Sequence, residues 1–173
     1  MKKNLVLTGM MGVGKSTIGK NVAKKLKLKF VDIDTTIEKE EKRTIAEIFK
    51  SDGEKYFRKI EKKITLEVLQ KNNLVISLGG GAFLNKSIRR EVLSSSISIW
   101  LDLNVKNLYM RLKNVKKRPL LKAEKLEETI NKIYTERKKF YNQSNYKITS
   151  DLLEINKIVK KVIELYESSR NKI

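Results

Sequence analysis

The sequence predicts an α/β fold in which a central parallel sheet of about five strands is covered on both faces by helices. Short apolar runs alternate along the chain with segments whose apolar residues recur at helical spacing, and this alternation is typical of a doubly wound sheet. The 173 residues, of which 40% are hydrophobic and 34% charged, have the size and composition of one globular unit. We therefore expect residues 1–173 to form a single domain.

Apolar runs mark the expected strands. They lie at residues 5–7, 30–31, 74–78, 97–101 and 146–148. Runs that are apolar throughout are typical of strands buried on both faces of a parallel sheet. Such sheets bind ligands at the carboxyl ends of their strands, so the residues that follow these runs are the first candidates for a functional site.

Apolar stripes at helical spacing mark the expected helices. Their members are Ile18, Val22 and Leu26; Phe57, Ile60, Ile64 and Val68; Ile130, Ile133, Arg137 and Tyr141; and Ile155, Ile158, Val162 and Leu165. Thr44 and Glu47 have the spacing of a capping box, which predicts one more short helix beginning after Thr44.

Cysteine and histidine are both absent from the chain. Disulfides, thiol nucleophiles, imidazole bases and the usual zinc ligands are therefore excluded, and any chemistry must use carboxylates, lysine, arginine, hydroxyls and backbone groups. No apolar run approaches the roughly 20 residues that span a membrane, and the basic start "MKKNLVLTGM" has no small-residue cleavage site. We expect a cytoplasmic protein without a membrane partner.

The formal net charge of +19 allows two interpretations. Clustered lysine and arginine residues would supply the phosphate contacts of nucleic-acid binding. Here, however, the basic residues alternate with apolar ones, as in "VAKKLKLK" and "IVKKVIEL", which is typical of solvated helix faces. We expect no nucleic-acid partner, and an attraction for anionic small molecules fits the charge equally well.

The segment after the first expected strand carries a phosphate-binding motif. "GMMGVGKS", residues 9–16, fits G-x-x-x-x-G-K-[ST], and a strand precedes it and a helix follows, as the motif requires. In such a loop backbone N–H groups surround phosphate oxygens, Lys15 neutralises them and the Ser16 hydroxyl ligates Mg²⁺. A chance Lys-Ser turn is the disfavoured alternative. The expected ATP-binding residues here are Gly12, Val13, Gly14, Lys15, Ser16 and Thr17.

Two aspartates and three glycines follow the next strands. Asp32 and Asp34 end the second expected strand in "FVDIDT", where alternation along an extended segment would point both carboxylates the same way. A kinase needs one carboxylate near Mg²⁺ and one near the acceptor hydroxyl; the alternative is that these acids cap the following helix. Residues 79–81, all glycine, allow a ligand to approach the backbone closely, although they also fit a flexible turn.

Taken in order, these motifs resemble those of the shikimate kinase family over nearly the whole chain. The resemblance is carried by "GMMGVGKST", "DID", "FRKIE", "SLGGGA", "RPLL" and "ERKKFY". It implies a three-layer P-loop kinase fold with a substrate-binding insertion at about residues 33–61 and a lid at about residues 112–124. It also implies an activity, the transfer of the γ-phosphoryl group of ATP to the 3-hydroxyl of shikimate on the route to aromatic amino acids, by a monomer.

The resemblance also implies residue roles. Shikimate would be held by Asp34, Arg58, Gly79, Gly80, Gly81 and Arg137. Ser16 and Asp32 would serve Mg²⁺, with Ser77 as a further contact through water. Arg111 would pack near adenine, and Arg118 would close over the phosphates from the lid. Lys15, Asp34 and Arg118 are thus the expected catalytic residues, and a forked guanidinium on Arg58 or Arg137 suits the carboxylate of shikimate.

Other functions remain as alternatives. A related kinase of gluconate or of a nucleoside monophosphate would share the loop and the lid, but not the joint presence of "DID", "FRKIE" and the triple glycine. A basic nucleotide-binding module for nucleic acid would need exposed aromatic residues for stacking, whereas Trp100 lies in the apolar run "ISIWLDL" and is expected in the core. The segment "YKITSDLLEI" departs from the family by lacking an adenine-contacting arginine and proline, so base contacts there are unassigned.

Overall fold

A computed structural model describes residues 4–113, 125–151 and 153–170 of the chain. These residues contain a five-stranded sheet in which neighbouring strands are parallel and follow the order β2-β3-β1-β4-β5. The strands are β1 (Asn4–Thr8), β2 (Lys29–Asp32), β3 (Leu74–Ser77), β4 (Ser96–Asp102) and β5 (Tyr146–Thr149). The predicted fold class and the positions of all five expected strands are confirmed.

Burial explains why these short runs form strands. Every residue of β1, β3 and β4 is buried, because helices cover both faces of the sheet. The partially buried β2 and β5 lie at its two edges. In the centre, Leu5 pairs with Val75 on one side and with Ile97 on the other. The strand order reverses at β1, and the crevice beyond the carboxyl end of that strand is where such sheets take a ligand.

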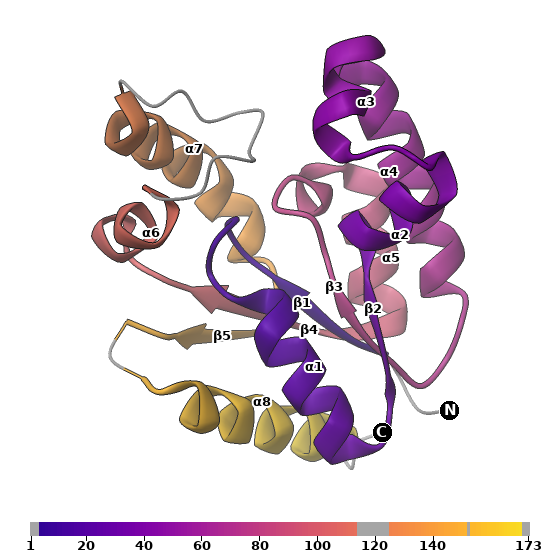
Figure 1. The fold of residues 1–173 in the computed structure, drawn as a ribbon. Helices are drawn as coiled ribbons and strands as arrows, with labels where there is room; N and C mark the ends of the chain where they lie inside the picture. The colour runs from indigo at the N-terminus through magenta and orange to yellow at the C-terminus, as the bar shows by residue number, and fades with distance from the viewer. Residues whose placement is uncertain (1–3, 114–124, 152, 171–173) are drawn as a thin grey trace.

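Helices form the outer layers. They are α1 (Lys15–Leu26), α2 (Ile33–Glu41), α3 (Ile45–Ser51), α4 (Gly53–Leu69), α5 (Lys86–Ser95), α6 (Val105–Leu112), α7 (Leu126–Tyr141) and α8 (Ile155–Arg170), with a 3-10 turn η1 (Ala82–Leu84). α1 and α8 pack together on one face of the sheet, and α4 and α5 pack together on the other (Figure 1). No helix in the described part of the chain is long and apolar enough to cross a membrane.

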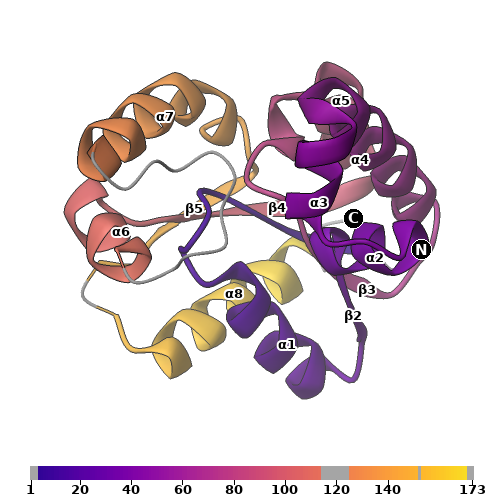
Figure 2. The same ribbon diagram turned by 45° about the horizontal axis from the view of Figure 1, so that its top comes forward.

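α2, α3 and the start of α4 rise beyond the carboxyl end of β2, while α6 and α7 lie on the other side of the carboxyl end of β1 (Figures 1 and 2). The expected insertion at residues 33–61 corresponds to the first of these groups. The predicted capping box is confirmed at the start of α3, where the Thr44 hydroxyl accepts from Glu47 N at 3.2 Å and Glu47 Oε2 accepts from Thr44 N at 2.7 Å. Most of the expected lid at residues 112–124 lies outside the described residues.

The core confirms three of the four apolar stripes and corrects the last. Trp100 is 1% exposed, as expected of a core residue. On α8, however, Ile155 is 51% exposed, whereas Val159 and Tyr166 are fully buried. Leu165 is partly buried, as are Leu26, Ile60 and Ile133 of the other stripes. Helical spacing from Ile158 and Val162 reaches Tyr166 as readily as Leu165, and the larger ring fills the space against the sheet.

Candidate active site

A cavity of about 740 Å³ lies at the carboxyl ends of β1, β2 and β3. Its walls come from the glycine-rich loop, the start of α1, the end of β2, the first turns of α2 and the residues after β3. The lining residues are Met11, Gly12, Gly14, Lys15, Ser16, Thr17, Lys20, Phe30, Val31, Asp32, Asp34, Thr35, Thr36, Lys39, Ser77, Leu78 and Gly80. The lining includes three lysines and two aspartates, so charges of both signs face the cavity.

The loop between β1 and α1 needs glycine for geometric reasons. Gly9 and Gly14 have φ of 132° and 99°, a region that L side chains rarely adopt. A Cβ on Gly9 would also collide with the Leu101 carbonyl oxygen. The first turn of α1 then begins with Ile18 N donating to Gly14 O at 2.9 Å. The helix therefore directs its positive N-terminal end into the cavity, as anion binding requires.

The Lys15 ammonium lies across this loop. Its side chain is 8% exposed and donates hydrogen bonds to the carbonyl oxygens of Gly9 and Met10, both at 2.9 Å. These bonds fold the lysine over the turn and place its positive charge beside the N-terminus of α1. A buried cation next to inward-facing amides forms a binding surface for phosphate oxygens.

Ser16 and Asp32 meet on the opposite side of the loop. The Ser16 hydroxyl donates to Asp32 Oδ2 at 2.5 Å. A hydroxyl and a carboxylate are the hard oxygen ligands that Mg²⁺ prefers, and Mg²⁺ in phosphoryl-transfer sites takes its remaining ligands from phosphate and water. The pair therefore fits the expected ion. Among the described residues no group of three or more carboxylates could hold a metal by itself.

The strand alternation expected of the two aspartates is wrong, because Asp34 lies in a helix, although both residues line the cavity. Asp32 is the last residue of β2 and the N-cap of α2, where its Oδ1 accepts from Thr35 N at 3.2 Å. Asp34 already belongs to the first turn of α2, so strand alternation does not apply to it. The helical turn directs Asp34 to Gly79, where a Cβ would lie 2.7 Å from Asp34 Oδ1. Asp32 thus both caps a helix and faces the phosphate loop, and Asp34 faces the glycine segment.

Arg58 reaches the same glycine segment from α4. Its two terminal nitrogens would lie 2.6 and 2.7 Å from a Cβ on Gly81. The guanidinium donates to Glu61 Oε2 at 2.8 Å and to Glu54 Oε1 at 3.1 Å. Glu61 is 2% exposed, and burial raises the pKa of its carboxyl although Arg58 and Arg137 oppose that shift. Arg58 is therefore held over Gly81 by acids on its own helix, and its side chain is still 30% exposed.

Arg137 approaches the glycine segment from α7. Its side chain donates to Gly80 O at 3.0 Å, and the Tyr141 hydroxyl donates to the same oxygen. Burial raises the pKa of Tyr141 to about 12, so this hydroxyl keeps its proton. A Cβ on Gly80 would lie 3.2 Å from Met11 N and 3.5 Å from Arg137 Nη1. Gly80 therefore brings the phosphate loop, Arg137 and the α7 helix into contact.

The chain matches known proteins along most of its length. The family model for shikimate kinase matches residues 11–167. The chain belongs to the shikimate kinase family. It is 40% identical to the shikimate kinase of Persephonella marina over 93% of this chain and 97% of that protein, and 43% identical to that of Bartonella henselae over 84% and 70%.

Solved structures agree with membership of the shikimate kinase family. Shikimate kinase from Acinetobacter baumannii in complex with shikimate superposes with a TM-score of 0.93 at 30% identity, covering 96% of this chain and 94% of that one. A gluconokinase from Sinorhizobium meliloti superposes with a TM-score of 0.63 at 15% identity, a likeness that concerns the fold alone. The alternative of a gluconate or nucleoside monophosphate kinase is therefore not favoured.

The structure brings together most residues expected from the shikimate kinase resemblance. Asp34, Arg58, Arg137 and the glycines at 79–81 share one corner, and the phosphate loop forms the adjoining wall. Arg111 donates to Val13 O at 3.1 Å, so it lies on the outer side of that loop. Arg118 lies outside the described residues.

Sequence reasoning assigned no role to two buried residues of this shikimate kinase site. Glu61 lies within a quoted motif without a role of its own, and Tyr141 is a member of an apolar stripe. Both stand in the quoted segments "FRKIE" and "ERKKFY", three residues after Arg58 and four after Arg137. Helix neighbours at this spacing share a face, so the spacing was a signal that these side chains support the two arginines.

Proposed function

We propose that this chain transfers the γ-phosphoryl group of ATP to the 3-hydroxyl of shikimate. The observation that carries the proposal is that the phosphate loop and the corner of Asp34, Arg58 and Arg137 meet at Gly80, whose would-be Cβ contacts both Met11 N and Arg137. A triphosphate on the loop and a small acid in the corner would therefore be neighbours. Membership of the shikimate kinase family supports the choice of acid.

The corner suits a small polyhydroxylated carboxylic acid. Arg58 and Arg137 offer guanidinium donors, which match a carboxylate through two parallel hydrogen bonds. Asp34 offers an acceptor for substrate hydroxyls at the other end. Gly79 and Gly81 leave room where side chains would press on Asp34 and Arg58. The two arginines thus bind the substrate carboxylate, and Asp34 orients a substrate hydroxyl.

The loop suits the triphosphate. Lys15 exchanges its bonds to Gly9 and Met10 for phosphate oxygens, which are stronger acceptors because they are charged. Ser16 and Asp32 would hold Mg²⁺, which would supply charge neutralisation at the phosphates. Arg111, which donates to Val13 O, is the proposed residue near adenine. Arg118, the expected lid residue for the phosphates, lies outside the described residues.

In the transfer, Asp34 orients the 3-hydroxyl towards the γ-phosphorus and accepts its proton as the new P–O bond forms and the bond to the ADP oxygen breaks. Lys15 stabilises the charge that spreads over the transferring group. Because the transition state of phosphoryl transfer is loose, positioning and charge contribute more than base strength.

The deciding experiment measures ADP release from Mg·ATP with shikimate, gluconate, AMP or single-stranded DNA added in turn. We expect stimulation by shikimate alone. Asp34→Asn should lower kcat with shikimate by about 100-fold or more, the size of effect typical of a lost general base, while leaving KM for ATP close to that of the wild type. Stimulation by another acceptor, or full activity of Asp34→Asn, would overturn the proposal.

A further inference from the structure

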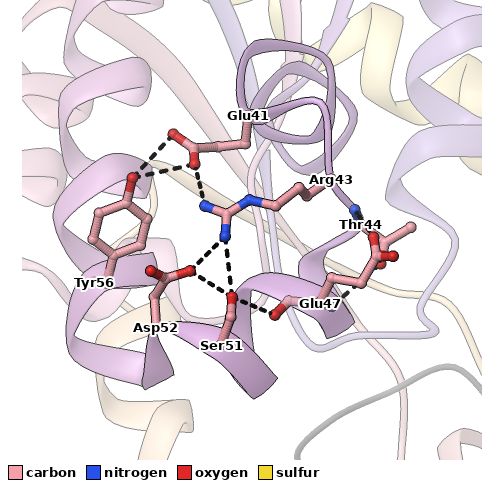
Figure 3. Close-up of polar contacts among 7 residues, drawn as sticks. All are labelled: Glu41, Arg43, Thr44, Glu47, Ser51, Asp52 and Tyr56. Atoms are coloured by element: carbon pink, nitrogen blue, oxygen red, sulfur yellow. Dashed lines mark hydrogen bonds and ion pairs between the residues drawn. The ribbon is translucent and has the colours of Figure 1, made fainter.

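A polar cluster lies at the outer end of the substrate-binding insertion, away from the cavity. It is centred on Arg43, in the connection between α2 and α3. Arg43 Nη2 donates to Glu41 Oε2 at 2.8 Å, while Nη1 donates to Asp52 Oδ2 at 2.6 Å and to Ser51 Oγ at 3.0 Å (Figure 3). One guanidinium therefore joins the end of α2 to the junction of α3 and α4.

Glu41 extends this cluster to a third helix. The Tyr56 hydroxyl, in the first turn of α4, donates to Glu41 Oε2 at 3.2 Å (Figure 3). The hydrogen bond to Glu41 raises the pKa of Tyr56, and hydrogen bonds from Ser51 and Arg43 lower the pKa of Asp52. At neutral pH the tyrosine thus stays a donor and Asp52 stays an anion, and the cluster keeps one pattern of donors and acceptors.

The helices that this cluster joins carry two of the proposed substrate-binding groups. Asp34 lies in the first turn of α2, and Arg58 lies on α4 two residues after Tyr56. The angle between α2 and α4 therefore sets the spacing between the acid that aims the hydroxyl and the arginine that binds the carboxylate.

The apolar contacts of the insertion do not set this angle alone. Phe49 of α3 and Phe57 of α4 pack with ring centroids 4.9 Å apart, and packing of this kind is non-directional. Helices α2 and α4 also pack directly on each other. Hydrogen bonds have preferred lengths and angles, so those of Arg43 add a directional constraint to this packing. Between α3 and α4 the chain turns at Gly53, with φ of 80° and no atom within 4 Å of a would-be Cβ.

We propose that Arg43, with Glu41, Asp52 and Tyr56, is a positioning clamp that fixes the α2–α4 geometry and thereby the spacing of Asp34 and Arg58. This inference rests on the proposed function. Arginine is the required residue because its planar fork reaches acceptors on two helices at once, which the single ammonium of a lysine does not reproduce. None of the four clamp residues lines the cavity, so the clamp acts only through the residues that it positions.

Steady-state kinetics with shikimate and ATP varied separately test the clamp. Arg43→Ala should raise KM for shikimate by about tenfold, because misplacing a binding group by a fraction of an ångström has effects of this order, and should leave KM for ATP unchanged. Tyr56→Phe should raise KM for shikimate less, and Arg43→Lys should give an intermediate value. Lys63→Ala is the matched control, since Lys63 makes only an exposed 4.0 Å pair with Glu67 on the same helix α4.

The outcomes separate this inference from the proposed function. If the wild type does not phosphorylate shikimate, the proposed function fails and the clamp with it. If the wild type is active and Arg43→Ala matches it in KM for shikimate, or raises KM for ATP equally, the clamp alone is overturned. Should Arg43→Ala fail to fold, the test is made with Tyr56→Phe, which removes one hydroxyl. A selective rise in its KM for shikimate supports the clamp, and an unchanged KM overturns it.

Discussion

Arg58 donates to one carboxylate oxygen of Glu61 at 2.8 Å, whereas the other oxygen, Glu61 Oε1, is buried and accepts no hydrogen bond from the described residues. The acid therefore holds the arginine in place at an energetic cost to itself. Its folded-state pKa is raised by burial. The pair lies beside the proposed substrate-binding residues, and because the pKa of Glu61 is raised in the folded state, its contribution to stability depends on pH.

Glu61→Gln should remove the contribution of this carboxyl to the pH dependence of the unfolding free energy. Between the ordinary carboxyl pKa of about 4.3 and the raised folded value, the unfolded wild type releases a proton that the folded wild type retains. Wild-type stability therefore falls as pH rises through this window, by at most about 1.4 kcal/mol per pH unit. Glutamine carries no such proton, so the unfolding free energy of Glu61→Gln should rise relative to the wild type over the same window and then level off.

Denaturant unfolding at a series of pH values measures this difference. Glu67→Gln is the control, because Glu67 lies on the same helix, is 55% exposed in its side chain and makes only a 4.0 Å pair. A constant difference between Glu61→Gln and the wild type across the window would contradict the prediction.

Gly79→Ala should impair the acceptor site and spare the nucleotide site. Gly79 does not have a positive φ, so alanine fits the backbone, but its Cβ would lie 2.7 Å from Asp34 Oδ1 and 2.8 Å from Glu61 Oε1. Both carboxylates must move. We expect kcat/KM for shikimate to fall by about 100-fold, with KM for ATP as the internal control; an equal loss for both substrates would argue against a local effect.

Lys15→Met should impair the nucleotide site instead. The substitution removes the ammonium that lies across the loop and leaves the apolar stem, so the helix remains intact. We expect kcat/KM for ATP to fall by about 100-fold or more, as is typical when a charge that stabilises the transition state is lost. Lys24→Met, an exposed lysine on the same helix, should retain wild-type kinetics, and a similar loss in both variants would refute a specific role.

Asn4→Ala should destabilise the fold without altering substrate binding. Asn4 Nδ2 donates to Lys71 O at 2.6 Å, and its Oδ1 accepts from Leu74 N at 3.0 Å, so one buried side chain satisfies backbone groups on both sides of the turn before β3. Their loss should cost about 1–3 kcal/mol in unfolding free energy. Asn21→Ala removes only an exposed bond to Thr17 O and should have little effect in the same denaturation experiment.

Local patterns in the sequence predict the fold and the phosphate loop well. Buried strands appear as apolar runs, helices as apolar residues at helical spacing, and the loop as glycines at fixed spacing. Asp34 shows where this reasoning stops. Its direction depends on β2 ending at Asp32 and α2 beginning at Ile33, a boundary that the alternation of "DID" does not reveal.

Contacts between residues far apart in the chain could not be predicted from local sequence patterns. Arg58 and Gly81 are brought together by the packing of α4 beside η1, and Arg137 reaches Gly80 from a helix near the other end of the chain. The resemblance to the shikimate kinase family predicted that these residues would bind the same substrate, but not which of their atoms would be in contact. Helical spacing places Glu61 and Tyr141 on the same faces as the two arginines, but their burial, which makes them supports, requires the assembled structure.

The packing of Trp100 has a practical consequence. It is the only tryptophan of the chain, it lies 5.9 Å from the ring of Tyr141, and Tyr141 donates to the carbonyl of Gly80. The protein therefore carries an intrinsic fluorophore one side chain away from its acceptor pocket. Emission from this indole offers a label-free titration of acceptor binding in the absence of turnover.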